Sequence, residues 1–174
     1  MSRYLIAATI LAAAAAALLL AACRDEEEAG RPTAPFDGAS ADFESPDFQT
    51  IESGDQSGIG GEEPSLFVLR NEDDWRDFWS LHQSHTLPPP EPPDVDFERD
   101  MVIAAVDGAQ PSGGYTFEID AIGQEDGRMI VSVTRRVPEG CVTTAALTQP
   151  YEIVRLARSD LDAEIEVTEE TYDC

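Results

Sequence analysis

The sequence predicts a mainly β domain of the α+β class, either an antiparallel β-sandwich or an open barrel, with one covering α-helix. Two observations predict this class. Six or seven short runs, each apolar or alternating, are separated by turn residues such as glycine, proline and aspartate. Only one stretch repeats its apolar residues with the helical period. The length of 174 residues allows one such domain after a leader and a tether.

The first elements are two short strands. Residues 48–52 alternate apolar and polar side chains, and residues 66–69 form a short apolar run. The glycine- and serine-rich segment 53–61 separates them and predicts a loop.

A helix is predicted from Asn71 to about His82. Asn71 suits an N-cap, and the acidic first turn that includes Asp74 favours a helix N-terminus. Side chains at i, i+3, i+4 and i+7 then form one buried face: Trp75, Phe78, Trp79 and His82. The proline-rich run 87–93 ends the helix.

The remaining elements are predicted strands. Residues 101–106 are continuously apolar, which indicates a strand covered on both faces. Residues 115–121 alternate, and Asp126-Gly127 predicts a hairpin turn into the partner strand 128–134. Two further strands are predicted, at residues 151–157 and 163–168.

The N-terminus predicts a bacterial lipoprotein. Arg3 and the apolar run 5–20 form the basic and apolar parts of a signal peptide, and Leu20-Ala-Ala-Cys23 forms a lipobox. Cleavage would leave Cys23 as the lipidated first residue, and two or more acyl chains would anchor it stably. The alternatives are an uncleaved transmembrane helix and a secretory signal cut after Ala22.

This leader sets the predicted organisation and location. Residues 1–22 are the signal peptide, residues 23–46 form a disordered acidic tether, and residues 47–174 form the domain. The expected location is the cell envelope, facing the periplasm or the cell surface. Arg24 follows the lipidation site in place of the aspartate that retains many lipoproteins at the inner membrane, which favours the outer membrane.

Charge excludes one class of partner. The chain has 35 acidic residues against 11 arginines and no lysine, a formal net charge of −24. Such a chain does not bind nucleic acid through phosphate contacts, because these require basic patches. Strong acidity either maintains solubility outside the cell or serves a basic partner.

The two cysteines that follow Cys23 predict a disulfide. Cys141 and Cys174 form an even pair in a compartment that permits disulfides. The alternative is a redox or metal-binding thiol, which lacks a CxxC spacing here.

No motif for catalysis or for a cofactor is present. The chain has no nucleophile elbow, phosphate loop or HExxH sequence. His82 and His85 could face a metal together, but no carboxylate or cysteine is spaced to complete the site. We therefore predict no catalytic residues, no metal and no cofactor.

The most distinctive local feature is the connection 107–115. Its two adjacent glycines permit positive φ or a close approach of another backbone, and an aromatic residue follows at once. The connection is either a tight structural turn or a rigid recognition loop. In the second case the partner-binding residues are Pro111, Ser112, Gly113, Gly114 and Tyr115.

These residues resemble the PrcB family of protease-complex subunits. The resemblance covers about residues 48–168 and depends on the order of several short patterns: Asp74-Trp75, Phe78-Trp79, Asp96-Phe97, Met101-Val-Ile103, Gly108-x-x-Pro-Ser-Gly-Gly-Tyr115 and Thr148-Gln-Pro-Tyr-Glu-Ile-Val154. It implies a small β-rich domain, lipid-anchored or secreted, that binds or assembles with a protease and does not itself catalyse.

Two other functions stay open at this point. The loop 111–115 is more distantly similar to a loop that chagasin-type inhibitors insert into cysteine proteases, although its first residues differ. The chain would then be a protease inhibitor. The other alternative is a small hydrolase with a site that the sequence does not reveal.

Overall fold

The computed structural model describes residues 46–174, so the signal peptide, Cys23 and the tether as far as residue 45 lie outside the described residues. No helix in the described part is long and apolar enough to cross a membrane. The elements in chain order are β1 (Phe48–Gly54), β2 (Ser65–Leu69), α1 (Glu72–His82), β3 (Asp100–Val106), β4 (Thr116–Glu125), β5 (Arg128–Glu139), β6 (Tyr151–Ala157) and β7 (Ala163–Asp173).

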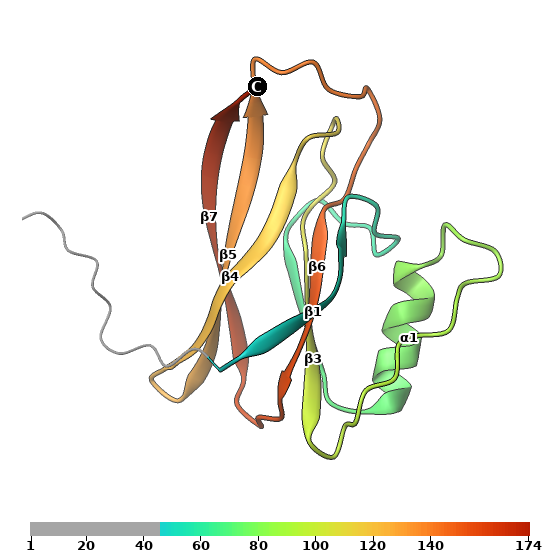
Figure 1. The fold of residues 1–174 in the computed structure, drawn as a ribbon, viewed down its shortest axis with the longest axis vertical. Coiled ribbons are helices and arrows are strands. Elements are labelled where there is room, and N and C mark those ends of the chain that lie inside the picture. Colours follow the sequence, from blue (N-terminus) through green and yellow to red (C-terminus); the bar gives the residue numbers. More distant parts are fainter. Residues whose placement is uncertain (1–45) are drawn as a thin grey trace, which may run out of the picture. The chain divides into compact units, whose positions relative to one another are not determined.

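The strands form two sheets that pack as a sandwich, and α1 adds a third layer (Figure 1). One sheet has the order β1-β6-β3-β2 and the other the order β4-β5-β7. The helix and the second sheet cover opposite faces of the first sheet. The mainly β prediction is confirmed, and of its two forms the sandwich is the one observed.

One pairing differs from the predicted antiparallel arrangement, because β5 and β7 run parallel. The chain leaves β5, forms β6 in the opposite sheet and returns to β7, so both strands run in one direction. Their register extends to Glu139 opposite Asp173, beyond the predicted strand ends. Cys141 and Cys174 follow those ends, and the structure joins them in the expected disulfide with Cα atoms 5.3 Å apart.

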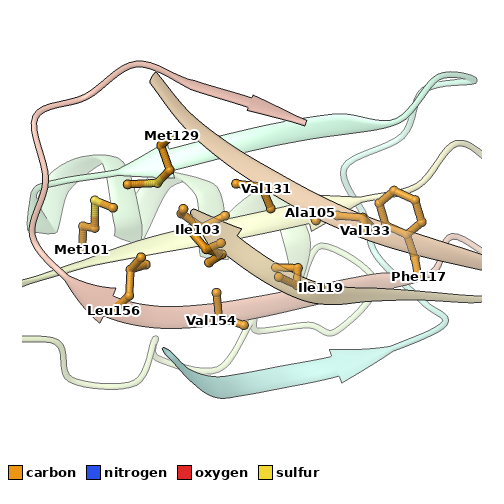
Figure 2. Close-up of a cluster of buried hydrophobic side chains, with 11 residues drawn as sticks. Met101, Ile103, Ala105, Phe117, Ile119, Met129, Val131, Val133, Val154 and Leu156 are labelled. Carbon is orange, nitrogen blue, oxygen red and sulfur yellow. The ribbon is translucent and has the colours of Figure 1, made fainter. Parts of the chain in front are cut away.

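The central strand β3 explains why the domain has two cores. Its side chains at 101, 103 and 105 enter the sandwich interior, which Figure 2 shows, where they meet Phe117 and Val131 from the other sheet. Its side chains at 102, 104 and 106 face α1. All six are buried, so the predicted strand with two covered faces is confirmed.

The helix begins and packs as predicted. Asn71 caps it by accepting the Asp74 amide N–H at 2.9 Å. Trp75, Phe78, Trp79 and His82 are buried against the first sheet. The two indole N–H groups donate to backbone carbonyls of the proline-rich segment, Trp75 to Pro93 and Trp79 to Pro90, both at 3.0 Å.

The predicted hairpin turn is also present. Asp126 and Gly127 both have positive φ, 47° and 79°, between the paired residues Glu125 and Arg128. Positive φ at both central positions matches the right-handed twist of the two strands, which explains the Asp-Gly sequence.

Candidate functional site

Three connections meet at one end of the sandwich. They are residues 55–64, 107–115 and 140–150, and together with Cys174 we call them the loop end. Backbone hydrogen bonds tie them together. Gln110 and Thr148 exchange two such bonds, of 2.8 and 3.0 Å, and the Ala109 N–H donates to the Gly61 carbonyl at 3.0 Å. Loops bonded in this way present a defined surface.

A buried carboxylate holds the start of the 107–115 connection. The Asp107 side chain is fully buried and accepts the Gly108 N–H at 2.8 Å, the Gln110 side-chain amide at 2.9 Å and the Arg135 Nε–H at 2.9 Å. A second Arg135 N–H also donates to it. The hydrogen bonds from Arg135 to Asp107 raise the pKa of Arg135. The Asp107 carboxylate makes these hydrogen bonds within the domain, and they hold the start of the 107–115 connection in place.

The two glycines serve close packing within the loop end. The Gly113 N–H donates to the Thr144 carbonyl at 3.0 Å, and a Cβ at Gly113 would lie 2.6 Å from the Thr144 hydroxyl. Gly114 has φ +92°, and its carbonyl accepts the Tyr172 hydroxyl at 2.7 Å. The glycines therefore have the structural role that the sequence left as one alternative. The same packing makes the loop rigid, as recognition would require.

The predicted partner-binding residues differ in accessibility. Pro111 and Gly114 are exposed, Ser112 and Tyr115 are half-buried, and Gly113 is buried. Thr148 fixes Ser112 by donating its hydroxyl to the Ser112 carbonyl at 2.8 Å. A partner could therefore touch Pro111, Gly114 and Tyr115 directly, while Gly113 supports them from beneath.

Sequence reasoning missed two apolar side chains beside this loop. Val142 is fully exposed and Leu147 is 75% exposed, both in the 140–150 connection. Two large aliphatic side chains exposed on one connection favour a binding surface there. Their only sequence signal is that apolar residues occur between Gly140 and Pro150 without the alternation of a strand.

A pocket of about 420 Å³ adjoins the predicted loop. It lies where the end of β1, the start of β4 and the end of β7 meet, and three tyrosines line it: Tyr115, Tyr151 and Tyr172. The rest of its lining is Ser53, Gly54, Asp55, Gly114, Thr116, Phe117 and Glu118. We call it the tyrosine pocket.

A second polar cluster has the composition of a hydrolase triad. The His82 Nδ1 lies 3.0 Å from the Ser57 hydroxyl, and its Nε2 lies 3.3 Å from the Glu52 carboxylate. His82 is 0% exposed, stacked on Phe78 and in edge contact with Tyr151. Burial lowers the pKa of His82.

Since the imidazole has no exposed surface, the cluster fastens the 55–64 connection to α1 and offers His82 no contact with a substrate. Gly58 is fixed in the same way, because its N–H donates to the His82 carbonyl at 2.8 Å. Residues 46–174 contain no group of three or more histidine, cysteine or acidic side chains arranged to hold a metal ion.

A family model described as PrcB C-terminal matches residues 101–157. The matched segment runs from β3 to β6 and includes both the 107–115 and the 140–150 connections. No curated protein and no solved structure matches the chain.

Proposed function

Since this chain belongs to the PrcB family through residues 101–157, we propose that it is a lipid-anchored binding or assembly subunit that accompanies an envelope or secreted protease. The family match is the observation that carries the proposal, because the family is a protease-associated, subunit-type domain. In this role the chain contributes contacts to the complex and no catalytic residues.

The geometry of the loop end supports a binding role. Two of the three connections lie inside the matched segment, and backbone bonds and the Asp107–Arg135 pair hold them in one conformation. A rigid surface loses little conformational entropy on binding. The exposed Val142 and Leu147 provide apolar area in the 140–150 connection, and Tyr115 in the 107–115 connection is a residue type favoured at interfaces.

The anchor is supported by the lipobox that ends at Cys23. Mass spectrometry of the mature N-terminus should find an acylated Cys23, and Cys23→Ser should release the protein from membranes or leave its leader uncleaved. A wild-type chain that keeps residues 1–22 and carries no acyl group would instead indicate a helical anchor.

The association with a protease is tested in the native cell. Crosslinking of the full-length lipoprotein followed by purification should recover a protease in near-stoichiometric amount. Deletion of the chain should lower the amount or maturation of that protease. If the lipoprotein is purified after crosslinking and no protease is recovered with it, the proposal is wrong.

An assay with the purified lipoprotein and the purified protease distinguishes a subunit from an inhibitor. Adding the lipoprotein to the purified protease should leave proteolysis unchanged or make it longer-lived. Stoichiometric loss of proteolysis would instead assign inhibition. Turnover of a peptide or ester by the lipoprotein alone would assign a hydrolase.

A further inference from the structure

We propose that the tyrosine pocket receives a cationic side chain, an arginine or a lysine, from the protein partner of this domain. The inference rests on the proposed function, because it names the chemical feature that the partner would present. It concerns a site adjoining the loop but lined mostly by residues from elsewhere in the chain, from β1, β4, β6 and β7.

The lining of the pocket is negative. Asp55 and Glu118 are its two charged residues, and among the described residues that line it none is basic. The pKa of Tyr151 is raised, first by burial and then by the nearby Glu52 and Asp55 carboxylates, which places a second carboxylate, Glu52, close to this lining. A chain with 35 acidic residues and 11 arginines repels anionic groups at such a place and attracts cationic ones.

The aromatic walls suit the same ligand. A cation within about 6 Å of a tyrosine ring is attracted by the negative face of the ring, and guanidinium stacks on it especially well. The domain already contains one such contact, since the Arg135 guanidinium lies 5.9 Å from the Phe117 ring centroid. Tyr115, Tyr151 and Tyr172 all line the pocket; Tyr115 is half-buried and Tyr172 exposed, whereas Tyr151 is buried and its ring also packs on His82.

The pocket is also built before any ligand arrives. Tyr172 is fixed by its hydroxyl, which donates to the Gly114 carbonyl at 2.7 Å, and the Cys141–Cys174 disulfide lies two residues further along the chain. Asp55 is held by its carbonyl, which accepts the Gln149 N–H at 2.8 Å. A preformed pocket binds with little ordering cost.

The test titrates arginine amide into the full mature lipoprotein in detergent micelles, followed by amide NMR. Citrulline amide is the matched ligand, since its side chain has nearly the same shape as that of arginine but carries no charge. Arginine amide should give saturable shifts at Gly114, Tyr115 and Thr116, and citrulline amide should bind at least about fivefold more weakly. Equal binding of the two ligands, or no saturable shift, would overturn the proposal.

Matched variants locate the site. Asp55→Asn and Glu118→Gln should each weaken arginine amide several-fold. Glu125→Gln removes the same charge from the exposed far end of β4 and should not. If all three variants weaken binding equally, the ligand is responding to net charge and the pocket is not its site. This test uses no partner protein. If arginine amide does not bind the pocket, the proposed association with a protease is unaffected. If no protease is recovered by crosslinking, the binding of arginine amide can still be judged by itself.

Discussion

The helix side and the loop end use large apolar side chains in opposite ways. Beneath α1, Trp75, Phe78 and Trp79 are all buried, and backbone carbonyls satisfy both indole N–H groups. At the loop end, Val142 and Leu147 project into solvent. The helix side is held by burial, whereas the loop end is held by a disulfide, an ion pair and backbone hydrogen bonds.

The difference separates stability from binding. Burial of an aromatic side chain removes a large apolar area from water, so the helix side contributes strongly to the free energy of unfolding. A surface that must meet a partner cannot bury its own apolar groups. It therefore needs fixed polar and covalent contacts to hold its shape, as Asp107 and the Cys141–Cys174 disulfide provide.

The largest expected effect is on the helix side. Trp79→Ala should lower the free energy of unfolding by about 3–5 kcal/mol, because it leaves a cavity between α1 and the sheet and strips the Pro90 carbonyl of its donor. Urea unfolding measures this. Leu81→Ala on the same helix is the control, because Leu81 is 52% exposed, and it should change stability by under about 0.5 kcal/mol.

The outcome for Trp79→Ala can also break the comparison. If this variant is as stable as wild type but no longer captures the protease, the tryptophan face is an interface. The assignment of stability to the helix side would then be wrong.

The next largest effect concerns the Cys141–Cys174 disulfide of the loop end. The disulfide spans 33 residues, and loop-closure entropy gives about 3–4 kcal/mol for its removal. Reduction should lower the melting temperature of wild type and leave Cys141→Ser/Cys174→Ser unaffected. Both cysteines should resist alkylation until the native protein is reduced. Free thiols at both positions in the native protein would contradict the pairing.

Local signals predicted most of the fold. The Asp126-Gly127 turn, the Asn71 cap and the continuous apolar run of β3 each depend on residues adjacent in sequence, and each has the expected structure. The parallel pairing of β5 with β7 depends on a strand crossing to the opposite sheet, and no local pattern encodes that. The sequence therefore predicted β5 and β7 as shorter strands in an antiparallel arrangement, and this prediction was wrong.

The site was predicted less fully for the same reason. The 107–115 connection stood out because its glycines are adjacent, and the structure explains them by contacts with Thr143, Thr144 and Pro138. The tyrosine pocket joins Tyr115 to Tyr151 and Tyr172, which are 36 and 57 residues away in sequence. Only the fold brings such residues together, so the sequence could indicate one wall of the pocket and not the other two.

The smallest effect on stability should accompany a large effect on binding. Leu147→Ser should change the free energy of unfolding by under about 0.5 kcal/mol, because its side chain is already 75% in water. It should nevertheless weaken protease capture, since an apolar side chain buried at an interface contributes about 1.5–3 kcal/mol. Leu87→Ser is the matched control: Leu87 is 89% exposed but lies in the segment after α1, outside the matched residues 101–157, so it should leave both quantities unchanged. If Leu87→Ser weakens capture and Leu147→Ser does not, the partner binds beside the helix, and the roles assigned to the two regions must be exchanged.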